Sequence, residues 1–157
     1  VSRFLRNPEQ VSEALGQRIA VVLDELGYIP NRVPEILSNA TSKAIAVLLP
    51  SLTNHVFADV LKGIETVNDA AGYQTLVAHF GYQAEKEERQ LRSLLGWNVD
   101  GVILTERTHT PATLRMLETA GIPVVEIMDS VSPCLDMAVG FDNTEAARQM
   151  AVTLIRR

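Results

Sequence analysis

The sequence has little of what marks several protein classes. Cys134 is the only cysteine, so an intrachain disulfide is impossible, which fits a reducing cytoplasm. The longest apolar run, Ala44 to Leu49, is far too short to cross a bilayer. Val1 is not followed by the long apolar region of a signal peptide. We therefore expect a cytoplasmic protein without a membrane segment.

Motifs for catalysis and cofactor binding are also missing. The apolar run ending at Leu49 leads into a loop without glycine, which excludes a dinucleotide fingerprint and a P-loop. Neither a GxSxG elbow nor an HExxH pair occurs. His55, His79 and His109 lie on separate predicted loops, so we interpret them as scattered surface histidines, not as metal ligands. We expect no enzyme, no cofactor and no metal site.

The charge distribution limits how the chain could bind nucleic acid. The net charge is −5, and 46% of the residues are hydrophobic, which is typical of a globular protein with a core. The charges of residues 1–43 balance, so the acidic excess lies beyond them. DNA binding by residues 1–43 would therefore depend on a few well-placed side chains.

The first 43 residues follow a helical pattern. Apolar residues between positions 11 and 26 recur at helical spacing, with Ser12 as a cap and Gly27 at the end. Gly16 is unfavourable inside this predicted helix. Phe4 and Leu5 look like the end of an earlier helix.

A short amphipathic segment and a linker follow this helix. Residues 28–32 form a predicted extended turn, residues 33–37 a short amphipathic segment, and residues 38–42 a small polar linker.

Beyond Lys43, strands and helices alternate. The predicted strands are Ala44–Leu49, Tyr73–Ala78, Gly101–Thr105, Val124–Ile127 and Met137–Phe141. The predicted helices are Phe57–Ala71, Glu85–Leu95, Ala112–Ala120 and Thr144–Ile155. Such alternation predicts an α/β fold with a five-stranded parallel sheet and helices on both faces. The charged run 85–89 is interpreted as a solvated helix face.

Polar residues follow the predicted strand ends, where open α/β sheets bind their ligands. They are Ser51, Thr53, Asn54, His79, Glu106, Arg107, Asp129, Ser130, Asp142 and Asn143. Hydroxyls, amides and carboxylates suit a polyhydroxylated ligand. Simpler roles stay open: Asn54 and Asn143 could only cap helices, and Glu106 and Arg107 could only pair in solvent.

Two sets of motifs carry a family resemblance. The first set is Val1-Ser2-Arg3, Asn7-Pro8, Val11-Ser12 and Leu26-Gly27-Tyr28-Ile29-Pro30-Asn31. The second is Lys43 to Pro50, Phe57, Gly63-Ile64, Gly72-Tyr73, Asp100 to Ile103 and Gly121 to Val125. In this order they resemble the LacI/GalR family of repressors over the whole chain. Within that family, residues 104–110 and 139–143 look most like gluconate-operon repressors.

The resemblance implies a division of the chain. The family has a helix-turn-helix head, a hinge helix and two lobes with a periplasmic-binding-protein-like fold. Residues 1–40 match the C-terminal part of the head with the hinge helix, and residues 44–157 match the N-terminal lobe of the effector-binding domain. We therefore expect a fragment that is truncated at both ends.

The resemblance also implies residue roles in DNA binding. The matching positions are Ser2, Arg3, Asn7, Asn31, Arg32 and Leu37. Arg3 matches a position in the major groove, and Leu37 matches a leucine that wedges into the minor groove beside its dimer mate. Leu37 as an ordinary apolar helix residue stays an alternative, and Glu35 in the hinge segment would repel phosphate.

Effector-pocket positions are implied in the same way. They are Ser51, Thr53, Asn54, Phe57, Thr105, Glu106, Arg107 and Asp129. The chemistry of the Arg107 guanidinium, not the resemblance, suggests that it holds the carboxylate of a sugar acid.

We interpret the chain as part of a non-enzymatic repressor. Its expected partners are operator DNA, when the protein is full length, a sugar or sugar-acid effector such as gluconate, and a second copy that binds through hinge and sensor lobes. The alternatives are a stand-alone sugar-binding module, a small α/β enzyme, and a fragment without activity.

Overall fold

The computed structural model describes residues 1–31, 33, 36, 41–131 and 133–156. The chain divides into two units, Val1–Ala40 and Thr41–Arg157, which we describe separately. The DNA-contact roles expected for Arg32 and Leu37 lie outside the described residues, as does most of the predicted segment 33–37.

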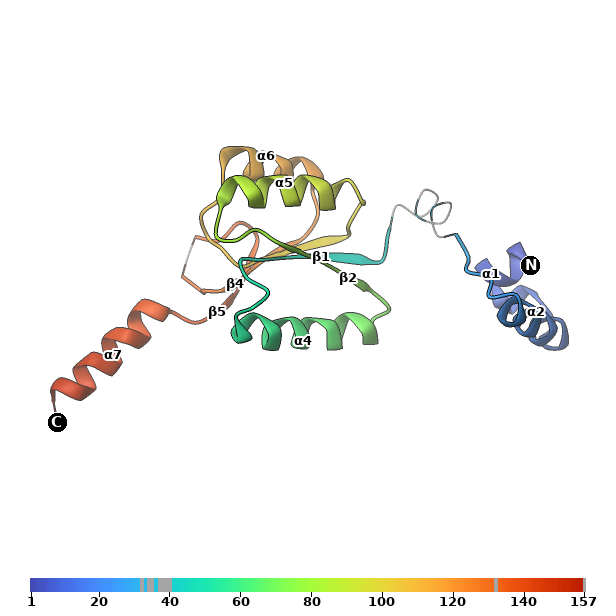
Figure 1. The fold of residues 1–157 in the computed structure, drawn as a ribbon, viewed down its shortest axis with the longest axis horizontal. Helices are drawn as coiled ribbons and strands as arrows, with labels where there is room; N and C mark the ends of the chain where they lie inside the picture. The colour runs from blue at the N-terminus through green and yellow to red at the C-terminus, as the bar shows by residue number, and fades with distance from the viewer. Residues whose placement is uncertain (32, 34–35, 37–40, 132, 157) are drawn as a thin grey trace. The chain divides into compact units, whose positions relative to one another are not determined.

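Residues 1–31 of the first unit hold two α-helices and a 3-10 turn. They are α1 (Ser2–Arg6), the turn Pro8–Gln10 and α2 (Glu13–Glu25), as Figure 1 shows. Gly27 has a φ of 59°, the left-handed conformation expected after a helix end. Ser12 is the N-cap of α2, but its side chain makes no capping hydrogen bond. Gly16 is the buried residue of α2, and it faces the ring of Phe4.

The second unit has the predicted α/β alternation. Its elements are β1 (Ala44–Leu49), α4 (His55–Ala70), β2 (Gln74–His79), α5 (Ala84–Leu95), β3 (Gly101–Leu104), α6 (Pro111–Ala120), β4 (Val124–Met128), β5 (Met137–Gly140) and α7 (Asn143–Ile155). The five strands are parallel in the order β2-β1-β3-β4-β5. Helix α4 covers one face, and α5 and α6 cover the other (Figure 1). The expected five-stranded parallel sheet with helices on both faces is confirmed.

Alternate residues of β1 supply the two sides of the core. Ala46 and Leu48 pack with residues of α5 and α6, whereas Val47 and Leu49 pack with Phe57 of α4. A strand that is buried on both faces needs apolar residues at every position, which explains the unbroken apolar run.

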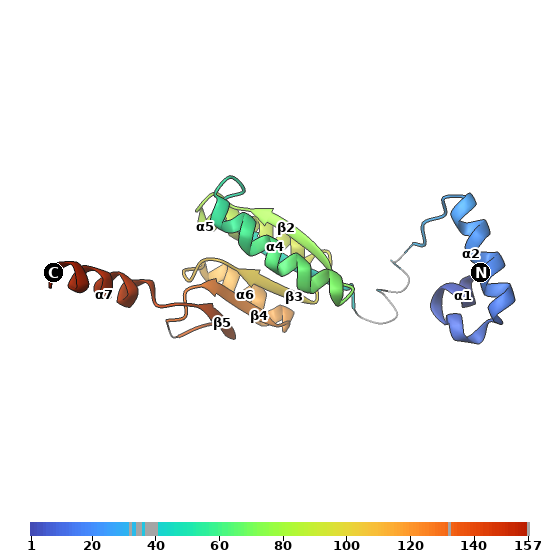
Figure 2. The same ribbon diagram turned by 90° about the horizontal axis from the view of Figure 1, so that it is seen from below.

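One face of the sheet is only partly covered. Figure 2, seen from the side of α4, shows β4 and β5 uncovered beside this helix. A groove of about 530 Å³ lies there, lined by α4 and by residues that include Ile127, Val139 and Phe141. Helix α7 forms close to its predicted bounds but buries no residue. Among the described residues, no helix is long and apolar enough to span a membrane.

Asp100 forms hydrogen bonds with the first residues of the second unit. Its carboxylate accepts hydrogen bonds from the backbone N–H of Ser42 at 2.9 Å, from that of Lys43 at 3.0 Å, and from the hydroxyl groups of Thr41 and Ser42. Burial disfavours the charged carboxylate, but these hydrogen bonds outweigh burial and lower the pKa of Asp100. The residues that follow the first unit are therefore fixed to the position just before β3.

Candidate functional site

The strand order places a topological switch point at β1. Its successor β2 lies on one side of β1, and β3 lies on the other. The loops that follow β1 and β3 therefore leave the sheet in opposite directions, which is where doubly wound sheets bind ligands. We define the switch-point edge as residues 50–54 together with residues 105–110.

The loop after β1 is held by its own polar side chains. Ser51 Oγ lies 3.2 Å from Thr53 Oγ1 and accepts hydrogen bonds from the N–H groups of Thr53 and Asn54, each at 3.2 Å. Asn54 Oδ1 accepts from the N–H of Val56 at 3.1 Å and so caps α4, which confirms the capping role considered for it. The hydroxyl of Thr53 and the amide of Asn54 are exposed at this edge.

Two expected effector contacts point into the protein. Thr105 is 8% exposed, and its hydroxyl donates to the carbonyl of Leu48 at 3.2 Å, which ties β3 to β1. Phe57 is 7% exposed and packs in the core against Val47 and Leu49. Both residues support the switch-point edge from beneath, and their contact with an effector stays a prediction.

Acidic side chains lie half-buried near this edge. Burial raises the pKa of Glu106, and the nearby charge of Glu87 adds to the increase. Asp129, at the end of β4, accepts a hydrogen bond from the N–H of Val131 at 2.7 Å. Carboxylate oxygens accept hydrogen bonds from hydroxyl groups, which suits a ligand that carries hydroxyls.

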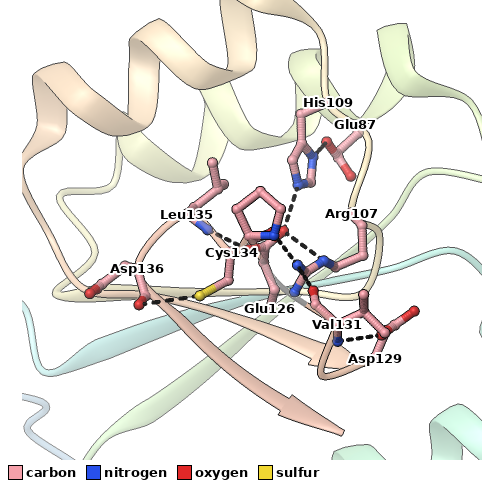
Figure 3. Close-up of polar contacts among 10 residues, drawn as sticks. Glu87, Arg107, His109, Glu126, Asp129, Val131, Cys134, Leu135 and Asp136 are labelled. Carbon is pink, nitrogen blue, oxygen red and sulfur yellow. Dashed lines mark hydrogen bonds and ion pairs between the residues drawn. The ribbon is translucent and has the colours of Figure 1, made fainter. Parts of the chain in front are cut away.

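Arg107 turns towards β4 and the loop beyond it. Its Nη2 donates to the carbonyl oxygens of Val131 and Pro133, and its Nε lies 3.6 Å from Glu126 Oε1 (Figure 3). Its side chain is 21% exposed. The salt bridge of Arg107 is therefore with buried Glu126, not with Glu106 in solvent. Its contact with an effector carboxylate stays a prediction.

Behind Arg107 lies a buried ionic network that sequence reasoning missed. His109 Nδ1 lies 2.6 Å from Glu87 Oε1, and His109 Nε2 lies 3.7 Å from Glu126 Oε1 (Figure 3). Burial opposes the imidazolium, but the hydrogen bond and charge of Glu87, with Glu126, raise the pKa of His109. The surface location predicted for His109 is thus wrong.

The prediction that residues 85–89 form a solvated helix face is also wrong at Glu87, which is 1% exposed. A signal was present in the sequence. Glu87 precedes Leu91 by four residues and Leu94 by seven, which places it on the buried face of α5.

Ser130 is exposed, and the other three polar residues near strand ends have partners within the protein. His79 is exposed, with Nε2 3.3 Å from Lys86 Nζ. Asp142 caps α7 by accepting from the N–H of Glu145 at 2.8 Å. Asn143 donates to the carbonyl of Met128 at 3.1 Å, so its predicted capping role falls to Asp142.

The described residues expected to contact DNA lie on the surface of the first unit. Ser2, Arg3 and Asn7 are exposed, and Asn7 ends α1. Asn31 is exposed, and its Oδ1 accepts from the N–H of Val33 at 3.0 Å. None of these side chains serves the core, so they are available to a partner.

The chain thus consists of a small helical unit followed by a parallel α/β lobe with polar groups at its switch point. Residues 42–157 match the family model of periplasmic binding proteins and the sugar-binding domain of the LacI family. Residues 1–31 match the model of bacterial regulatory proteins of the lacI family. The chain therefore belongs to the LacI family, as the sequence motifs indicated.

Individual relatives agree with this assignment. The chain is 73% identical over 157 residues to the HTH-type transcriptional regulator GntR of Escherichia coli K12, and 46% identical to the regulator IdnR of the same organism. Each alignment covers the whole of this chain but only 47% of the relative, so the chain spans about half the length of these relatives. A crystal structure of a LacI family transcriptional regulator from Silicibacter pomeroyi has a TM-score of 0.90 at 41% identity, with 99% of this chain and 46% of that one covered.

Proposed function

We propose that this chain is part of a DNA-binding transcription repressor whose operator affinity is controlled by a small sugar or sugar-acid effector. Residues 1–40 would form the C-terminal part of the DNA-binding head with the hinge helix, and residues 44–157 the N-terminal lobe of the effector domain. The observation that carries this proposal is that one chain matches both family models, in the order head and then sugar-binding domain.

The cellular setting follows from the same assignment. A repressor of this kind acts in the cytoplasm and is not an enzyme. Its heads bind two half-sites of an operator, which requires a homodimer. The exposed Ser2, Arg3, Asn7 and Asn31 would contribute contacts from each copy.

The side chains at the switch-point edge support an effector that carries both hydroxyl groups and an anion. Thr53 and Asn54 offer exposed hydrogen-bonding groups, while Glu106 and Asp129 can bridge sugar hydroxyls. Arg107 is the basic residue nearest to these groups in the sequence and suits a carboxylate. Gluconate combines these features. Because the chain spans about half the length of its relatives, the rest of the protein would supply the opposite wall.

Control of DNA binding requires that the effector bind two conformations of the protein unequally. An inducing sugar acid would favour the conformation whose heads fit the operator poorly. Binding of the effector then lowers the affinity for the operator by the same factor by which binding of the operator lowers the affinity for the effector.

The test uses the whole gene product that contains this chain. Gel-shift titrations with DNA from upstream of its own operon, at physiological salt, should show specific binding that gluconate weakens and glucose leaves unchanged. Calorimetry should show heat for gluconate, and Arg107→Ala should reduce gluconate affinity. Binding of gluconate without any specific DNA binding would favour a stand-alone sugar-binding module, and turnover of a sugar substrate would favour an enzyme.

A further inference from the structure

Three buried ionisable side chains lie in a row behind the switch-point edge. Glu87 of α5, His109 and Glu126 of β4 have side chains that are 1%, 1% and 2% exposed. His109 lies between the two carboxylates, 2.6 Å from one and 3.7 Å from the other. Buried ionisable groups persist only where they are paired, so this arrangement requires compensation of its charge.

The groups that face His109 come from three parts of the lobe. Glu87 comes from α5, Glu126 from β4, and Arg107 and Glu106 from the segment between β3 and α6. Glu88, next in α5, accepts from the hydroxyl of Thr110 at 2.8 Å instead. With His109 protonated, two buried carboxylates meet two cations, His109 and Arg107. With His109 neutral, Glu87, Glu126 and Arg107 together carry one net negative charge, to which Glu106 nearby can only add.

Glu126 links His109 to Arg107. The same oxygen, Oε1, lies 3.7 Å from His109 Nε2 and 3.6 Å from Arg107 Nε. The other oxygen accepts from the N–H of Leu135 at 2.6 Å. Among the described residues, neither His109 Nε2 nor Arg107 Nη1 has a hydrogen-bond partner. Two cations therefore share one carboxylate oxygen, and each has a donor that is not satisfied.

This sharing decides what Arg107 can offer to a ligand. If His109 is charged, it compensates part of Glu126, so Arg107 keeps positive charge for an incoming anion. If His109 is neutral, Glu126 neutralises Arg107 and Glu87 remains uncompensated nearby. An anion would then approach a negative site.

We propose that His109 is a positioning residue that sets the preference of this lobe for an anionic effector. It acts through Glu126, and it does not touch the effector. This inference rests on the proposed function, because it takes Arg107 as the residue that meets the effector's carboxylate. The chemical class selected is a sugar acid, and a neutral sugar gains nothing from the imidazolium.

Calorimetry of gluconate and glucose between pH 6 and pH 9, on the whole gene product, tests this role. Gluconate affinity should fall roughly tenfold as the pH rises through the raised pKa of His109, which is the size of one charge-assisted contact. Glucose binding should not follow this profile. His109→Gln should bind gluconate weakly at every pH, with a flat profile. The matched control His55→Gln, at an exposed position of α4, should keep the wild-type profile.

A second variant and a second measurement keep the role testable if His109→Gln does not fold. Glu87→Gln keeps the shape of the side chain but removes its charge, so it should lower the pKa of His109 and move the pH profile to lower values. An NMR titration of the His109 ring nitrogens, without effector, should give a pKa above that of an ordinary histidine.

The outcomes separate the two proposals. Gluconate affinity and a pH profile that are unchanged in His109→Gln would overturn the positioning role, as would a His109 pKa at or below that of an ordinary histidine. An absence of heat with gluconate in the wild-type protein at every pH would instead overturn the sugar-acid assignment on which this role rests.

Discussion

The ring of Phe4 in α1 lies directly against Gly16 in α2, where a Cβ atom would stand 3.2 Å from Phe4 Cε2. Glycine costs a helix interior about 1 kcal/mol relative to alanine, but here it allows the two helices to approach. Gly16→Val should therefore destabilise the first unit by about 2 kcal/mol through overpacking. Thermal unfolding followed by circular dichroism, with hydrogen exchange of the α1 and α2 amides, would measure this loss.

A glycine in open space provides the control. Gly63 lies in α4, and no atom is within 4 Å of a Cβ built there. Gly63→Ala should raise the stability of the lobe by about 0.5–1 kcal/mol, because helix propensity alone changes. Stabilisation by both substitutions would contradict the packing role given to Gly16.

The carboxylate of Asp100 should stabilise the lobe in a pH-dependent way. Its pKa is lower in the folded protein than in the unfolded chain. Its contribution is therefore present above the unfolded pKa and is lost as the pH falls through the folded pKa. Asp100→Asn should cost about 2 kcal/mol at pH 7, by urea unfolding, and the two proteins should converge in acid. Asp59→Asn, at an exposed position of α4, should show neither effect.

The close contact of β5 with β4 gives a third prediction. A Cβ on Gly140 would stand 2.5 Å from the Asp129 N atom and 2.6 Å from the Met128 C atom. These are backbone atoms, so one strand must move. Gly140→Ala should destabilise the lobe by about 2–3 kcal/mol and displace Asp129. Urea unfolding gives the first quantity, and a crystal structure of the variant would show the second; an unmoved Asp129 would contradict it.

The buried carboxylate of Glu126 should matter far more than an exposed one. Glu126→Gln leaves Arg107 and His109 without their shared anion, and we expect a loss of about 3 kcal/mol. Glu118→Gln, on the exposed side of α6, should change stability by less than about 0.5 kcal/mol. Chemical denaturation at pH 7 compares the two variants, and equal small effects would show that Glu126 is not compensated as described.

The sheet could be predicted from the sequence because its pattern is strong. The apolar run Ala44–Leu49 becomes β1 with the same bounds, since a central parallel strand is apolar on both faces. The glycine at position 121 takes the left-handed conformation that ends α6, as its place before a predicted strand indicated. These features depend on neighbouring residues, which the sequence shows directly.

The ionic network behind the switch-point edge could not be predicted in this way. Glu87, His109 and Glu126 are separated by 17 to 39 positions, and only the crossover of α5 and the pairing of β4 bring them together. Glu87 also lies within a charged run whose other members are partly or fully exposed. Periodicity could have placed Glu87 on the buried face of α5, but not its partner.

Strand β3 connects the hydrogen bonds of Asp100 with the switch-point edge. Its four residues, Gly101–Leu104, separate Asp100, which fastens residues 41–43, from Thr105 and the switch-point edge. Such a strand is about 13 Å long, and it is hydrogen-bonded on both sides. In mechanical terms β3 is a short stiff rod, with residues 41–43 held at one end and the switch-point edge at the other. A shift along its axis at one end is therefore felt at the other without the slack of an intervening loop.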